Sequence, residues 1–171
     1  MTKRVHFSKE YLTFDEVLLH HSMVEKSVYS FYRTPIQSEF IGYTLKELET
    51  ELEDRIQEHD KISCLTLLSA MEALLKMDYL QRCYTKQKDN ISRKFRELHK
   101  DKGARVSLEE DILAIWKEEG AGKNTFSQAV GALKYRHWLA HGRYWIPNLG
   151  REFDFDYLYA LVCEIERLIA N

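Results

Sequence analysis

The sequence predicts an all-α protein: an up-and-down bundle of about four to six helices, forming a single domain over residues 1–171. Three observations predict this class. Apolar residues recur every three or four positions along most of the chain. Two prolines and seven glycines leave little room for a turn-rich β architecture. Finally, capping boxes, the side-chain pairs that satisfy free amides where helices begin, precede apolar runs at four places.

The first two boxes place the N-terminal helices. Thr13 with Glu16 opens a helix whose apolar period continues to about residue 32. Thr44 with Glu47 opens a longer one that reaches about Lys86, either unbroken or interrupted near residue 60. These two elements together account for more than a third of the chain.

The next stretch, residues 89–103, is open to two interpretations. Its apolar positions form a helical stripe, consisting of Ile91, Phe95 and Leu98. The sequence at 100–103, Lys-Asp-Lys-Gly, is instead typical of an exposed loop. A third box, Ser107 with Glu110, then opens a short helix.

Two further helices complete the predicted bundle. A box of Thr125 with Gln128 opens a helix that runs to about His141, where Gly142 supplies a C-terminal stop. The last helix is capped by Asp154 or Asp156, and its apolar positions run from Leu158 to Ile169.

Charge is distributed unevenly, although the net charge is only −2. Residues 44–60 carry seven acidic and two basic side chains, whereas residues 82–105 carry nine basic and three acidic ones. Such runs are commonly solvated helix faces, and the basic one also suits a polyanion. Three cysteines without CxxC spacing favour reduced thiols and a cytoplasmic location. The sequence shows no signal core and no membrane-spanning apolar run, so we expect no membrane partner.

The most informative segment for chemistry is the end of the helix expected to begin at Thr125. Arg136 precedes His141 by five residues, and Gly142 follows. The fork of an arginine suits phosphate oxygens, and histidine moves protons near neutral pH. On a regular helix these two residues are about 140° apart, whereas His137 and His141 share a face. Either the last turn deforms at Gly142 to bring Arg136 and His141 together, or a second copy of the chain completes the site.

Neighbouring residues supply candidate binding groups. Lys134 and Arg143 would offset the negative end of the helix dipole for a bound phosphate. Tyr144 and Trp145 either stack unpaired bases or pack over the helix end. Glu72, inside the apolar run at 64–77, is either exposed between buried stripes or a buried partner of Arg136.

His137 and His141 also have the spacing of a helical metal pair. The residues between them do not form the HExxH motif. A third ligand would have to come from elsewhere, from His20, Asp154 or Cys163. We therefore expect neither a metal nor a cofactor.

The stretch Arg136-His137-Trp138-Leu139-Ala140-His141, on a late helix of a small all-α bundle, resembles the motif of the HEPN superfamily (higher eukaryotes and prokaryotes nucleotide-binding). That motif is an arginine, a polar residue, three to five others and a histidine. Glu72, within residues 69–75, is similar to the acidic position that faces the motif in this family. Residues 89–124 have no counterpart that we can place.

The resemblance implies a metal-independent endoribonuclease. In this scheme His141 takes the proton of a ribose 2′-hydroxyl, and Arg136 neutralises charge on the phosphate. His137, or a histidine of a partner chain, protonates the leaving 5′-oxygen, which gives 2′,3′-cyclic phosphate and 5′-hydroxyl ends. The resemblance also implies a homodimer with a composite site and a toxin or anti-phage role under a cognate antitoxin. The alternative is a non-catalytic module that binds nucleotides, RNA or protein.

Overall fold

The computed structural model describes residues 4–33, 38–119 and 121–170, and all regular structure within these ranges is helical. The described ranges contain six α-helices, a 3₁₀ turn, η1 (Ser38–Phe40), between the first two, and a π-helical segment, η2 (Leu108–Leu113), before the fourth. The helices are α1 (Phe14–Arg33), α2 (Leu45–Thr85), α3 (Asn90–Lys102), α4 (Ala114–Glu119), α5 (Lys123–Ala140) and α6 (Phe155–Ala170). The predicted all-α class is confirmed. No helix in the described ranges combines the length and apolarity needed to cross a bilayer.

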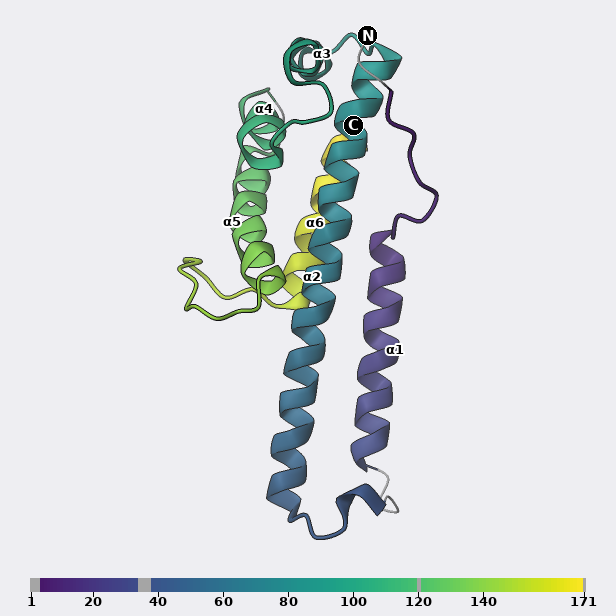
Figure 1. Cartoon of the computed structure of the whole chain (residues 1–171), viewed down its shortest axis with the longest axis vertical. Helices are drawn as coiled ribbons and strands as arrows, with labels where there is room; N and C mark the ends of the chain where they lie inside the picture. The colour runs from purple at the N-terminus through teal and green to yellow at the C-terminus, as the bar shows by residue number, and fades with distance from the viewer. Residues whose placement is uncertain (1–3, 34–37, 120, 171) are drawn as a thin grey trace.

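Helix α2 is the axis of the molecule (Figure 1). It runs for 41 residues and continues unbroken past Asp60. The predicted box at its start is present, with Thr44 and Glu47 each accepting a backbone N–H of the other. Helix α1 packs along the N-terminal half of α2, and the other helices gather around the C-terminal half (Figure 1).

The hydrophobic core lies within the C-terminal half of α2 and its neighbours. Every buried residue of α2 lies at or beyond Ser63, and those of α1 lie at or before His21. The distal ends of α1 and α2 therefore project beyond the core as a two-helix arm. The largest fully buried side chains come from α2, α3, α5, α6 and η2, and include Tyr79, Phe95, Phe126, Leu67, Met71, Ile112 and Leu158.

The predicted helix starts are confirmed at α1 and α6. The Thr13 N–H donates to Glu16 Oε2 over 2.8 Å, and the Glu16 N–H donates to Thr13 Oγ1 over 3.2 Å. At α6 the cap is Asp154, whose Oδ1 accepts the N–H of Tyr157 over 2.7 Å. Asp156 lies within the first turn.

The predicted start of α5 is wrong. The helix begins at Lys123, two residues before Thr125, and its N-cap is Gly122 with no side-chain cap. Gly122 has a φ of +89°, and a Cβ there would overlap the side chain of Leu168 on α6. Glycine therefore allows both the left-handed backbone and the close approach of α5 to α6.

Residues 89–103 adopt the helical alternative. Asp89 caps α3 by accepting the Ser92 N–H over 2.9 Å. The helix ends at its C-cap, Gly103, whose N–H donates to the backbone carbonyl of His99 over 3.0 Å. Residues 100–102, which the alternative interpretation placed in a loop, thus form the end of α3. Burial of Phe95 in the core stabilises the helical conformation of this charged segment.

Candidate functional site

The Arg–His segment lies at the C-terminal end of α5, beside α2. Helix α5 buries the stripe of Phe126, Ala129, Ala132 and Tyr135, which recurs every third residue. Lys134, Arg136 and His137 flank this stripe and keep solvent contact: Lys134 and His137 are exposed, and Arg136 is half-buried. The two small alanines let the helix lie close to its neighbours.

Glu72 of α2 holds Arg136. Arg136 Nη2 lies 3.4 Å from Glu72 Oε2, and the two side chains are 33% and 25% exposed. The other carboxylate oxygen, Oε1, accepts Lys76 Nζ over 2.7 Å. Of the two interpretations of Glu72, the structure supports the partner of Arg136. The buried Nε of Arg136 has no hydrogen-bond partner among the described residues, so the guanidinium keeps unused donor capacity.

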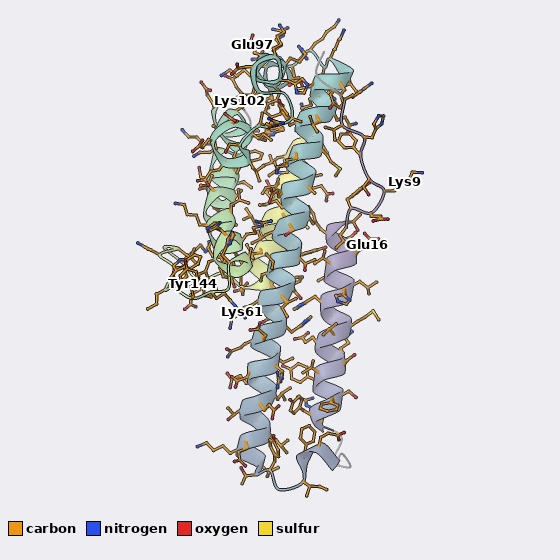
Figure 2. All side chains as sticks on the ribbon, in the orientation of Figure 1. Lys9, Glu16, Lys61, Glu97, Lys102 and Tyr144 are labelled. Carbon is orange, nitrogen blue, oxygen red and sulfur yellow. The ribbon has the colours of Figure 1, made fainter. Side chains whose placement is uncertain are left out.

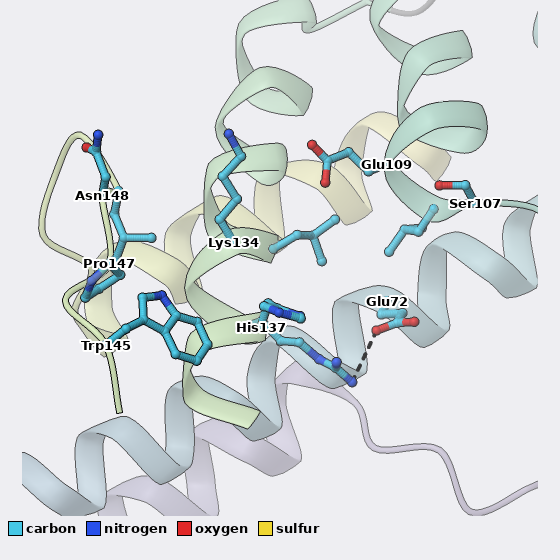
Figure 3. Close-up of a pocket in the computed structure, with 12 residues that line it drawn as sticks. Glu72, Ser107, Glu109, Lys134, His137, Trp145, Pro147 and Asn148 are labelled. Atoms are coloured by element: carbon cyan, nitrogen blue, oxygen red, sulfur yellow. Dashed lines mark ion pairs between the residues drawn. The ribbon is translucent and has the colours of Figure 1, made fainter. Parts of the chain in front are cut away.

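These residues open into a pocket of about 450 Å³, which we call the motif pocket. Helix α5 forms its floor, and two walls rise on either side, one from the loop after α5 and one from η2 and α2 (Figure 3). The volume is in the range typical of small-ligand sites. The lining residues are Leu133, Lys134, Arg136 and His137 of α5, Trp145, Pro147, Asn148 and Leu149 of the loop, and Glu72, Ser107, Leu108 and Glu109 opposite.

His137 and His141 form a contact pair on the helix end. Their ring centroids are 4.2 Å apart, and both residues are exposed. The His141 N–H still donates to the His137 carbonyl over 3.1 Å, so helical bonding continues through His141. The chain turns away only afterwards, at Gly142 and Arg143, with φ of +83° and +56°. The last turn therefore does not deform to carry His141 toward Arg136, and His141 does not line the motif pocket.

Arg143 is engaged elsewhere. Its Nη1 and Nη2 each lie 2.7 Å from an oxygen of Glu58 on α2, in a two-pronged ion pair. This contact raises the pKa of Arg143 and lowers the pKa of Glu58. Arg143 was predicted to bind RNA, but in this structure its donors anchor the turn after His141 to α2.

The two aromatic residues after the motif differ in placement. Trp145 is half-buried and lines the motif pocket, with its ring 6.1 Å from that of His137. Its carbonyl accepts Trp138 Nε1–H over 2.7 Å, which ties the loop to α5. Tyr144 is 85% exposed and lies on the loop that projects from the side of the bundle (Figure 2). Trp145 thus packs over the helix end and also faces the pocket.

Three polar residues of the motif pocket were missed by the sequence analysis: Ser107, Glu109 and Asn148. No local pattern marks them as pocket residues, because their position there depends on how η2 and the loop pack on α5; the capping box marks Ser107 only as a helix cap. Asp111 fixes η2 by accepting Lys102 Nζ over 2.7 Å and the Ser107 N–H over 2.9 Å.

Among the described residues, no three His, Cys, Asp or Glu side chains are grouped closely enough to hold a metal ion. The histidine pair has no third ligand from His20, Asp154 or Cys163. The groups that the pocket does offer are cationic, imidazole, carboxylate and amide side chains, which suit anion binding and proton transfer.

No family model, curated protein or solved structure matches this chain. The resemblance to the HEPN superfamily therefore stays a prediction from the motif, and the functional argument depends on the site.

Proposed function

We propose that the chain is a metal-independent endoribonuclease of the HEPN type, with RNA as its substrate. The observation that carries the proposal is the presentation of Arg136. Glu72 holds its guanidinium beside His137 in one pocket, and the ring of His141 contacts that of His137. A guanidinium and an imidazole that line one pocket, with a second imidazole in contact with the first, offer what phosphodiester cleavage needs: charge stabilisation, a base and an acid.

In the proposed reaction His141 accepts the proton of a ribose 2′-hydroxyl, and the oxygen attacks the adjacent phosphorus. Arg136 donates to the non-bridging oxygens as negative charge builds on them. The bond from phosphorus to the 5′-oxygen breaks, and His137 gives that oxygen a proton. The products are a 2′,3′-cyclic phosphate and a 5′-hydroxyl, and both histidines then exchange protons with water.

A second copy of the chain is part of the proposal. His141 lies outside the motif pocket that contains Arg136, and the helix remains regular between them. A histidine from a partner chain would place a base opposite Arg136 without any deformation of α5. We therefore propose a homodimer with composite sites.

The test is an RNA cleavage assay in chelator with the wild type, Arg136→Ala and His141→Ala. We expect cyclic phosphate ends from the wild type and a loss of at least about 100-fold in either variant. Arg93→Ala and His20→Ala are matched controls at exposed positions and should cleave normally. Intact RNA with pure wild type, or full activity in both motif variants, overturns the proposal.

The cellular role follows as part of the same proposal. An unrestrained ribonuclease damages its host, so we propose a toxin or anti-phage effector that a cognate antitoxin restrains. Induced wild-type protein should arrest growth, whereas His141→Ala should not. Equal toxicity of the two would contradict this role.

A non-catalytic module that binds nucleotides or RNA is the second candidate. One observation favours it: the pocket contains binding groups, Lys134, Arg136 and Trp145, while His141 lies outside. Product chemistry separates the candidates. RNA binding with no cyclic phosphate in any preparation identifies a module.

A further inference from the structure

The motif pocket contains cationic, anionic and amide side chains that are not paired with one another. Lys134, Glu109 and Asn148 line it, and all three are exposed. Within the described part of the chain, none of them makes a side-chain hydrogen bond or an ion pair. Lys134 and Glu109 come from α5 and η2 and face a common space (Figure 3). Such a pocket complements a ligand that is anionic at one end and donates hydrogen bonds at the other.

The remaining lining narrows the ligand class. Trp145 offers an aromatic face beside the cationic floor, and apolar contact comes from Leu108, Leu133 and Leu149. A flat, partly apolar group fits against such a surface, and bases stack on exposed aromatic rings in single-strand recognition. A pocket of about 450 Å³ accommodates one nucleotide.

We propose that the motif pocket binds one nucleotide of the substrate, with its base on Trp145, its 3′-phosphate at Arg136, and its base edge at Glu109. An ionised carboxylate only accepts hydrogen bonds, so Glu109 selects bases that donate. Guanine offers two adjacent N–H donors that match the two carboxylate oxygens, in the manner of a two-pronged ion pair. Uracil offers one N–H between two carbonyls. The pocket therefore prefers guanine, then adenine and cytosine, and accepts uracil least.

This inference takes the substrate to be RNA from the proposed function, but the test does not require cleavage. The four nucleoside 3′-monophosphates and inorganic phosphate are titrated into the intact protein in chelator, by calorimetry and tryptophan fluorescence. We expect guanosine 3′-monophosphate to bind about tenfold tighter than the uridine compound, which is in the lower part of the range that one two-pronged base contact supplies. Inorganic phosphate should bind weakest of all.

Matched variants assign the contacts. Glu109→Gln should reduce the guanine preference to about twofold, since the amide both donates and accepts, while Glu110→Gln on the same segment keeps it. Trp145→Leu should weaken binding of all four nucleotides about fivefold or more. Tyr144→Leu, at the exposed neighbour, should not. Circular dichroism of each variant establishes that it is folded.

Equal affinity for the four nucleotides and for inorganic phosphate overturns the inference and leaves only an anion site. An unchanged preference in Glu109→Gln also overturns it. These failures are distinct from failure of the proposed function, because monophosphates have no phosphodiester bond to cleave. A guanine preference without RNA cleavage would contradict the ribonuclease proposal and would still support a nucleotide-binding pocket.

Discussion

At the residue scale, Glu72 determines how Arg136 is presented. The Glu72 side chain is three-quarters buried, and its carboxylate pairs with Lys76 through one oxygen and with Arg136 through the other. It therefore holds the Arg136 guanidinium through a single nitrogen, Nη2. Glu72→Gln keeps the shape and removes the charge. We expect cleavage to fall about tenfold or more through misplacement of Arg136, since positioning is a large part of such catalysis. The measurement is kcat, together with Tm. Tm should change little, since we expect the free energy of unfolding to change by no more than about 1 kcal/mol.

The control for that change is Glu49→Gln, on the distal, exposed part of α2. It should alter neither kcat nor Tm. A Glu72→Gln enzyme with wild-type kcat would show that the ion pair is structural and that Arg136 needs no partner.

Glu58 is the second residue whose role is testable. With Arg143 it connects α2 to the turn that follows His141. Glu58→Gln should loosen that turn, so we expect faster proteolysis within residues 141–154. The stability loss should be below about 1 kcal/mol, because both side chains are at least one-third exposed. Mass spectrometry of the fragments locates the cut, and an unchanged digestion pattern would contradict the anchoring role.

The same pair has a defined pH dependence. Arg143 lowers the pKa of Glu58, so the folded state favours the charged carboxylate. The stabilisation is present above the unfolded carboxyl pKa of about 4.3 and is lost as pH falls through the folded value.

Arg143 also shows where residue-level reasoning from sequence stops. The spacing of Arg136 and His141 is local, and helix geometry placed His137 beside His141 correctly. The partner of Arg143 is 85 positions away in sequence, so no local pattern predicts it. Glu109 and Asn148 were missed for the same reason, since tertiary packing brings their segments to α5.

At the element scale, the turn after α5 depends on Gly142. Its φ is +83°, and a Cβ there would meet no atom within 4 Å. Gly142→Ala therefore acts through backbone strain alone, at about 1 kcal/mol of stability. We expect cleavage to fall as well, because this turn places Arg143 at Glu58 and Trp145 in the motif pocket. Chemical denaturation and kcat measure the two effects.

The chain offers a matched control in Gly42, which has a φ of +92° and equally open surroundings but lies in the turn before α2. Gly42→Ala should lose similar stability and keep full activity. Equal activity of the two variants would show that the turn at Gly142 does not position the site.

Helix boundaries that depend on capping residues and apolar periodicity were predictable from the sequence. Boundaries that depend on close packing between two helices were not. The boxes at Thr13 and Thr44 act within one turn, so sequence was sufficient. The start of α5 at Gly122 depends on Leu168 of α6, and Thr125 is therefore an interior residue. The π-helical form of η2 likewise has no signature in the capping box at Ser107.

At the scale of the whole molecule, one buried histidine joins three helices. His21 of α1 is 8% exposed and stacks between His59 of α2, at 4.8 Å, and Phe155 of α6, at 3.8 Å. Its Nδ1 has no partner among the described residues, and Nε2 lies 3.8 Å from Asp60. Burial lowers the pKa of His21, so the neutral ring is the folded form.

Acidification should therefore loosen the docking of α1. The stability that neutral His21 supplies is present above the unfolded pKa of about 6.5 and is lost as pH falls below it. Burial also raises the pKa of Asp60, and this shift favours the folded state only at a more acidic pH, where the carboxyl is protonated. The carboxylates of Glu25 and Asp156 also act on His21, and they favour its charged form. We expect Tm to fall between pH 7.5 and about 5.5, and to fall less in His21→Phe.

His20→Gln, at the exposed neighbouring position, is the control and should follow the wild type. Parallel pH curves for the wild type and His21→Phe would show that another group carries the acid sensitivity.

Assembly is the last property at this scale, and it links the regular geometry of α5 to activity. If each site combines Arg136 of one protomer with His141 of the other, Arg136→Ala and His141→Ala complement each other. Random mixing makes half of the dimers mixed, and each mixed dimer has one intact site of two, so activity should recover to about a quarter of wild type. The mixture is unfolded and refolded together, and light scattering measures its size. A mixture as inactive as its components, at the mass of a dimer, would place Arg136 and His141 of a single chain in each site and would require α5 to bend on binding RNA.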